Sequence, residues 1–256
     1  MADIIVERKG EVEWIALNRP ERMNAYDAAM AQELIAAVEN AADAGVIVLT
    51  GSGRAFCAGG YLANLSDPDP IALRNMFYGS LKVYEALRTS PRPVIAAVNG
   101  VAAGGGNELV VACDLAIAAE SATLGQTGVR VGSAPVLGGT HFLALNVGEK
   151  RAKEIAFLCR RYSAAQALEY GWINAVVPDD QLEAEVTKRR LSKMILSDAE
   201  ILDADGRWWK DDKTSAAKRR RTLKRDGLKC RCCGRTHKAS ELHVHHIVWR
   251  SKGGRT

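Results

Sequence analysis

The stretch that decides the fold is residues 98–118, VNGVAAGGGNELVVACDLAIA, in which three consecutive glycines lead into one glutamate and an apolar run. Glycine lets a backbone approach a ligand closely, and the first amide N–H groups of a helix have no partner within the helix. Residues 104–106 therefore predict a helix N-terminus that can hold an anion or a carbonyl oxygen. Glu108 lies in the first turn of that helix, where it can exchange a proton with a bound compound. The alternative interpretation is a glycine-rich turn beside a solvated glutamate.

The composition is that of a globular protein. The chain has 256 residues, 47% of them hydrophobic, enough for one large domain or two modest ones. Its formal net charge is +5, and the basic residues concentrate after Thr187. No apolar run approaches a membrane span, and the first ten residues, MADIIVERKG, lack the order of a signal peptide, so we expect a cytoplasmic protein without membrane contact. The cysteines, clustered only in the tail, favour a metal site there over a disulfide framework.

Short apolar strands alternate with glycine-rich loops and amphipathic helices, a pattern that predicts an α/β protein. We expect strands at 12–17, 46–49, 94–98, 114–118 and 173–177, and helices from 28 onward and at 71–88, 139–145, 149–161 and 164–170. Helical spacing of Met30, Leu34, Ala37, Val38 and Ala41 predicts a buried helix face. The glycine stretch lacks the spacing of a dinucleotide-binding turn, which argues against that class of fold.

Five segments carry a resemblance to a known family, and their order is LNRPERMNAYDAAMAQEL, VLTGSGRAFCAGG, PVIAAVNGVAAGGGNELVVACDLAIA, LGQTGVRVGSAPVLGGT and SAAQALEYGWINAVVP. Residues 4–187 thereby resemble the crotonase, or enoyl-CoA hydratase/isomerase, superfamily. The resemblance implies a spiral of ββα turns (a ClpP/crotonase-like fold) and assembly as a trimer or hexamer. It also implies binding of acyl-CoA thioesters without a resident cofactor.

The resemblance assigns site residues by motif. In this family two backbone N–H groups hold the thioester oxygen and stabilise an enolate, and they match Cys57 and Gly105 here. Cys57 is therefore expected to be a small buried residue and not a nucleophile. Glu108 matches one of the two catalytic glutamates of hydratases, whereas Gly128 occupies the position of the second. The residues implied in substrate or CoA binding are Arg22, Met23, Ala25, Ala58, Tyr61, Gln126, Thr127, Gly128 and Ser133.

One loop suggests a branch of the superfamily. Residues 125–133 and 149–178 are more similar to naphthoyl-CoA synthases and to hydrolases that open alicyclic ketoacyl-CoA rings. Those enzymes make or cleave a C–C bond beside a carbonyl. The synthases and 2-ketocyclohexane hydrolases carry an aspartate where this chain has Pro135, and the synthases share Gly128, where bound bicarbonate can supply the missing carboxylate. Other polar candidates near these loops are Tyr61, Tyr78, Ser133 and His141, although lone residues of these kinds more often have a structural role.

The tail changes in composition. Residues 1–187 are interpreted as an acyl-CoA core that lacks the usual C-terminal helices of the family, and residues 188–215 as a junction. Residues 216–256 resemble an incomplete HNH endonuclease segment, in which Cys230-x-x-Cys233 precedes HVHHI and SKGG. The resemblance implies a partial ββα-metal unit that binds zinc or another divalent metal through Cys230, Cys233 and His245, with His246 as general base. The run KRRRTLKR would add weak nucleic-acid contacts.

Three functional hypotheses remain open. The first is an acyl-CoA enzyme acting as a hydratase, isomerase or ring-opening hydrolase. The second is an HNH-type nucleic-acid-binding or cleaving module that carries the crotonase-like core as a passenger. The third is a non-catalytic chimeric scaffold.

Overall fold

A computed structural model describes residues 2–41, 43–60, 70–135, 137–193, 200–202 and 208–210. The chain divides into two compact units, Met1–Arg190 and Leu191–Thr256. The described part of the second unit includes an antiparallel pair of short strands, β11 (Glu200–Leu202) and β12 (Trp208–Lys210). All further description concerns the first unit.

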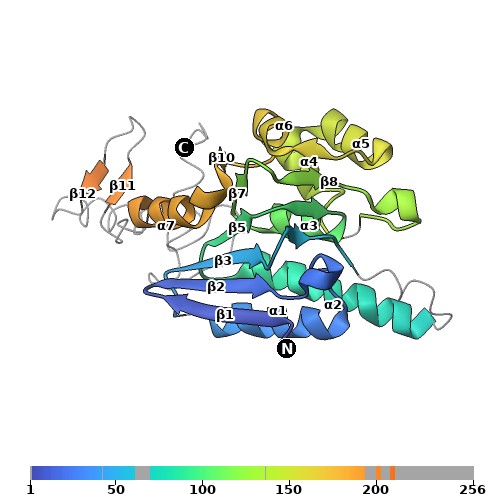
Figure 1. The fold of residues 1–256 in the computed structure, drawn as a ribbon, viewed down its shortest axis with the longest axis horizontal. Helices are drawn as coiled ribbons and strands as arrows, with labels where there is room; N and C mark the ends of the chain where they lie inside the picture. Colours follow the sequence, from blue (N-terminus) through green and yellow to red (C-terminus); the bar gives the residue numbers. More distant parts are fainter. Residues whose placement is uncertain are drawn as a thin grey trace, which may run out of the picture. The chain divides into compact units, whose positions relative to one another are not determined.

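A six-stranded sheet forms the centre of the first unit (Figure 1). Its order is β1 (Ile4–Lys9), β2 (Val12–Leu17), β3 (Val46–Gly51), β5 (Val94–Val98), β7 (Leu115–Ala119) and β10 (Ala175–Val177). The β1–β2 pair is an antiparallel hairpin, and the other pairs are parallel. The sequence pattern missed β1, because this edge strand buries only Ile4 and exposes the rest of its side chains.

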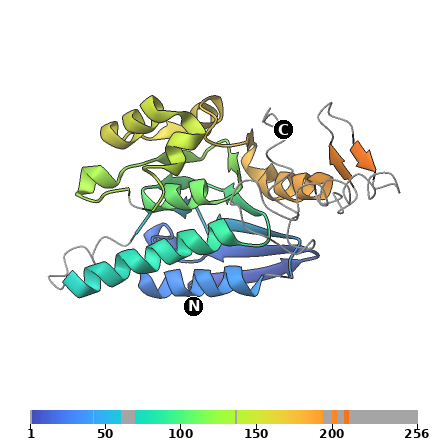
Figure 2. The ribbon, with the colours of Figure 1, turned by 180° about the vertical axis from the view of Figure 1, so that it is seen from behind.

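Two long helices lie side by side over one face of this sheet, α1 (Ala28–Asn40) and α2 (Pro70–Thr89) (Figure 2). The expected buried face of α1 is confirmed, since the five predicted positions from Met30 to Ala41 are all buried. The predicted strands and helices up to β7 agree with the structure to within two residues at each boundary.

A second, four-stranded sheet positions the glycine stretch. Its order is β4 (Ala55–Cys57), β6 (Val101–Ala103), β8 (Thr123–Gly125) and β9 (Tyr162–Ser163). Strands β4 and β6 are parallel, so their carboxyl ends meet at one edge. A Cβ on Gly100 would lie 2.2 Å from the Arg54 carbonyl oxygen. Only glycine, which has no Cβ, avoids this clash. The helix α3 (Gly105–Ala112) starts at this edge.

The remaining helices are α4 (Phe142–Val147), α5 (Glu149–Leu158), α6 (Ala164–Glu169) and α7 (Leu182–Lys193), with short 3₁₀ turns η1 (Pro20–Arg22), η3 (Gly128–Val131) and η4 (Asp179–Gln181). Two helix predictions were wrong at a boundary. α5 ends at Leu158, since Cys159 adopts the left-handed region at φ 50°. α4 begins three residues late because residues 137–141 form turns. Within the described residues, no helix is both long and apolar enough to cross a membrane.

Candidate functional site

The start of α3 packs against the end of β4. Gly104 takes φ 54° and ψ −120°, a conformation suited to glycine, and α3 begins at Gly105. A Cβ on Gly106 would lie only 1.9 Å from the Cys57 carbonyl oxygen, so the helix touches the backbone of β4 directly. The structure thus brings together the two segments that carry Cys57 and Gly105.

Glu108 is the buried acid of this site, with 4% of its surface exposed. Its Oε1 accepts hydrogen bonds from the amide of Leu137 at 2.8 Å and from that of Gly139 at 3.0 Å. Burial raises the pKa of Glu108 to about 7, although these two hydrogen bonds oppose the rise. A carboxyl group with this pKa can donate or accept a proton near neutral pH.

Residues 125–128 run along the N-terminus of α3. The Gly104 amide donates to the Gly125 carbonyl at 2.9 Å, and the buried Asn107 Nδ2 donates to Gln126 Oε1 at 2.8 Å. The Thr127 Oγ1 is 3.9 Å from the place of a Cβ on Gly104. Three predicted residues, Gln126, Thr127 and Gly128, therefore reach the site. Ser133 closes the next turn through its amide, which donates to the Gly128 carbonyl at 2.9 Å.

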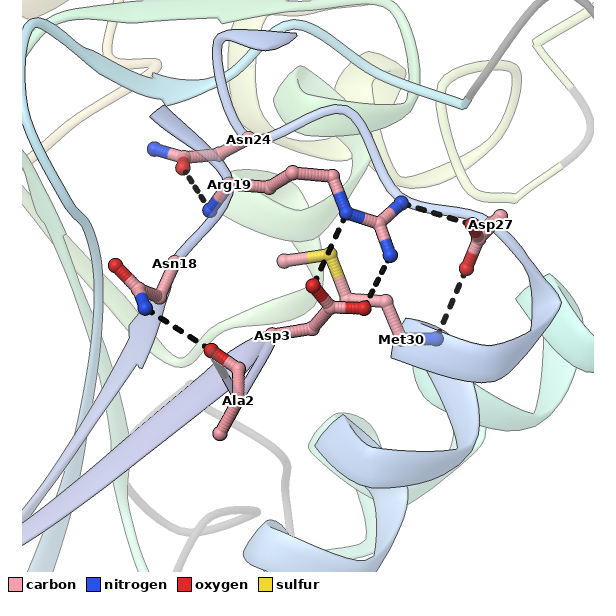
Figure 3. Close-up of polar contacts among 7 residues, drawn as sticks. All are labelled: Ala2, Asp3, Asn18, Arg19, Asn24, Asp27 and Met30. Carbon is pink, nitrogen blue, oxygen red and sulfur yellow. Dashed lines mark hydrogen bonds and ion pairs between the residues drawn. The ribbon is translucent and has the colours of Figure 1, made fainter. Parts of the chain in front are cut away.

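The turn before α1 is fixed in place by ion pairs (Figure 3). The Arg19 guanidinium lies between the carboxylates of Asp3 and Asp27 and is 2.8 Å from Asp27. Asp27 also caps α1 by accepting a hydrogen bond from the Met30 amide at 3.0 Å. The buried Asn24, at φ 58°, accepts from the Arg19 amide and donates from Nδ2 to the Ala55 carbonyl at 2.7 Å. The turn is thereby attached to β4.

The residues predicted to hold CoA lie on this turn and on the loop after β4. The Ala58 amide donates to the Met23 carbonyl at 2.9 Å, which places the two predicted segments against each other. Arg22 and Ala25 belong to the same turn and are joined by a backbone hydrogen bond of 3.1 Å. Arg22 is exposed to solvent, whereas Tyr61 lies outside the described residues.

The sequence interpretation missed Tyr26. Its hydroxyl is 2.9 Å from the place of a Cβ on Gly105 and is hydrogen-bonded to Ser80 on α2. Burial raises the Tyr26 pKa far above its ordinary value, with further contributions from Cys57 and Glu108, so the phenol stays protonated. Its only sequence signal was an aromatic residue in the motif before α1, which equally describes a core residue.

A second missed residue is Tyr84 on α2. Its ring lies 2.5 Å from the place of a Cβ on Gly138, in the loop that holds Glu108. Its buried hydroxyl has no hydrogen-bond partner among the described residues. Burial raises the pKa of Tyr84 to about 12, Arg88 lowers it, and the charge of Glu108 raises it further. Tyr26 and Tyr84 are thus two neutral donors whose ionisation is coupled to Glu108.

Other predicted candidates lie elsewhere. Tyr78 is 58% exposed under Arg74, and the exposed His141 lies beside Phe142 with ring centroids 4.2 Å apart and the ring planes tilted by 52°, so neither side chain is buried in the site. Cys57 is fully buried, and burial raises the pKa of its thiol to about 12, which leaves little thiolate. Within the described part of the chain, no group of three or more His, Cys, Asp or Glu residues could hold a metal. The predicted tail ligands Cys230, Cys233 and His245 lie outside it, as does His246, the predicted general base.

The chain is similar to known proteins in both sequence and fold. The family model described as enoyl-CoA hydratase/isomerase matches residues 7–204. An enoyl-CoA hydratase from Bacillus anthracis is 37% identical, with a TM-score of 0.72. The match covers 76% of this chain and 77% of the Bacillus chain. The Pseudomonas aeruginosa protein DspI is 32% identical, with a TM-score of 0.72, and the match covers 75% of this chain and 74% of DspI. An enoyl-CoA hydratase from Mycobacterium smegmatis is 28% identical, with a TM-score of 0.73, and the match covers 89% of this chain and 91% of the Mycobacterium chain.

Proposed function

The chain belongs to the enoyl-CoA hydratase/isomerase family, and we propose that it processes acyl-CoA thioesters by stabilising a thioester enolate. The observation that carries the proposal is the buried Glu108, with a pKa of about 7, on the helix that starts at Gly105. A base near the α-carbon and amide donors near the thioester oxygen are the two elements that enolate chemistry requires.

In this proposal, the Cys57 and Gly105 amides donate hydrogen bonds to the thioester oxygen. Glu108 removes a proton from the α-carbon, and the electron pair moves into the carbonyl, which gives an enolate oxygen between the two amides. Such preorganised donors typically lower a barrier by about 3 kcal/mol each. Because both donors belong to the backbone, side-chain identity at Cys57 matters little.

Among the reactions of the family, isomerisation of an enoyl-CoA needs only one base. Glu108 takes the α-proton of a 3-enoyl thioester and returns it to the γ-carbon, which yields the 2-enoyl thioester without a co-reactant. Hydration by two carboxylates is less well supported, because Gly128 stands at the position that the resemblance assigns to the second glutamate. The neutral Tyr26 hydroxyl lies beside Gly105, 2.9 Å from the place of a Cβ on that residue.

The test is exchange of the α-proton of butyryl-CoA in deuterated water, followed by mass spectrometry. This assay detects enolate formation whichever reaction follows it. We expect exchange with the full chain and a loss of about 10²- to 10⁴-fold in Glu108→Gln, the usual contribution of a general base. The exposed Glu169→Gln is the matched control. Equal exchange in wild type and Glu108→Gln would remove Glu108 from the mechanism.

A second candidate is C–C bond formation or ring opening, as in the naphthoyl-CoA synthase and alicyclic hydrolase branch. Gly128 in the QTG loop favours it, since bound bicarbonate could take the place of a carboxylate there. Gly128→Glu separates the candidates. If a missing carboxylate is all that prevents hydration, this variant gains hydration of crotonyl-CoA; a dependence of wild-type activity on bicarbonate supports the synthase-like branch instead.

The tail and the assembly are separate proposals. We propose that the core acts as a trimer or hexamer without a resident cofactor, and that Cys230 and Cys233 bind zinc. Light scattering of the purified chain measures its oligomeric state. Metal analysis of the wild type beside the double variant Cys230→Ser and Cys233→Ser measures zinc binding.

A further inference from the structure

A pocket lies between η3 and the end of α5. Its volume is about 750 Å³, within the range of small-molecule sites in proteins, roughly 300–1,000 Å³. Among the lining residues that the structure describes, Thr127 alone belongs to the proposed acyl-CoA site, and the rest of the wall lies outside that site.

One part of the pocket wall is apolar although it faces solvent. Val129 and Val131 come from η3, and Phe157 and Leu158 come from the last turn of α5. All four side chains are exposed, and Phe157 is 72% exposed. Adjacent exposed apolar side chains in a concave site favour an apolar ligand, because its burial removes their surface from water.

The rest of the wall is cationic. Arg130, Arg160 and Arg161 line the pocket, all three are exposed, and none of the described lining residues is acidic. Among the described residues, none of these arginines has a carboxylate within the 4.0 Å of an ion pair, whereas Arg8 and Arg19 each have two. Three unpaired guanidinium groups around an apolar wall complement a ligand with an anionic end and an apolar body.

The backbone around the arginines is held by close packing. The left-handed turn at Cys159 ends α5 and leads directly into Arg160 and Arg161. A Cβ on Gly125 would lie 2.6 Å from the Arg160 carbonyl oxygen and 3.5 Å from the Arg161 Cα, so this segment lies directly on β8. The backbone of this segment therefore needs little reordering on binding.

We propose that this pocket binds a medium-chain carboxylate. The hydrocarbon chain of the ligand covers the apolar wall, and its carboxylate pairs with the arginines. This site shares Thr127 with the proposed acyl-CoA site, but it does not depend on the proposed reaction.

The experiment is calorimetric titration of the full chain with octanoate. Octanol lacks the negative charge of octanoate, and acetate lacks its hydrocarbon chain. We expect both to bind at least tenfold more weakly than octanoate. The double variant Arg130→Gln and Arg161→Gln should lose at least tenfold in octanoate affinity and keep its affinity for butyryl-CoA. Arg151→Gln is the control, because Arg151 lies on α5 outside the pocket, over the Tyr170 ring at 4.0 Å.

Equal binding of octanol and octanoate, or unchanged octanoate affinity in the double variant, would overturn the proposal. Displacement of octanoate by butyryl-CoA would also overturn it, because it would place octanoate in the acyl-CoA site. Loss of butyryl-CoA binding in the double variant would overturn it as well, because the arginines would then belong to the acyl-CoA site. The substituted side chains are exposed, and thermal denaturation of each variant verifies that the fold is retained.

Discussion

Glu108 accepts a hydrogen bond from the amide of Leu137, 29 residues further along the chain, at an N to Oε1 distance of 2.8 Å. The Gly139 amide donates to the same oxygen at 3.0 Å. The loop that leads to α4 therefore holds the carboxylate through its backbone. Leu137 contributes its backbone amide and not its side chain. Leu137→Ala should therefore leave this hydrogen bond in place, and it serves as a control for the predictions on Glu108.

The rate of α-proton exchange should depend on pH through Glu108. Its pKa is raised to about 7, and only the ionised form acts as a base. The rate should therefore rise about tenfold per pH unit below pH 7 and level off above it. Leu137→Ala should keep this midpoint, and Glu108→Gln should give a low, flat profile. A midpoint near the ordinary value of 4.5 would contradict the burial argument.

The free energy of unfolding should depend on pH through the same residue. Since the pKa of Glu108 is raised on folding, the folded chain binds this proton more tightly than the unfolded chain. The contribution is fully present below pH 4.5 and is lost as the pH rises through about 7. Its size is about 3 kcal/mol. Urea denaturation across this range should show the loss in wild type and not in Glu108→Gln; parallel curves for the two proteins would refute it.

Local patterns in the sequence predicted most elements of the described fold. The apolar stripe of α1 and the apolar runs of β3 and β5 each bury a face that periodicity alone identifies. The glycines before Glu108 predicted the start of α3, because their backbone conformation and close approach exclude side chains. β1 was missed for the converse reason: an exposed edge strand has no buried face to mark it.

The partners of the site residues could not be predicted in the same way. Glu108 is held by amides, which every non-proline residue carries, so nothing in the identity of Leu137 indicates its role. Tyr26 and Tyr84 reach the site from α1's leading turn and from α2 through tertiary packing. Such convergence depends on how distant segments pack, whereas the spacing of residues reports only on neighbours along one element.

The contact between Tyr26 and Gly105 predicts coupled effects of substitution. In Gly105→Ala the new Cβ would lie 2.9 Å from the Tyr26 hydroxyl and 3.3 Å from the Gly60 amide nitrogen, which should cost about 1–3 kcal/mol of stability. Tyr26→Phe removes the nearer atom. The double variant should therefore be more stable than the sum of the single changes predicts, with part of the α-proton exchange restored. Strictly additive unfolding energies would show that the two residues do not touch.

Substitutions of Asp27 should separate its cap from its ion pair. Asp27→Asn keeps an acceptor for the Met30 amide and loses the charge opposite Arg19, which still pairs with Asp3. We expect this variant to cost less than about 1 kcal/mol, and Asp27→Ala, which also loses the cap, to cost about 1–2 kcal/mol. Urea denaturation measures both, with the exposed Asp180→Ala as control. Equal losses in the Asn and Ala variants would show that the ion pair with Arg19, and not the cap of α1, holds the turn.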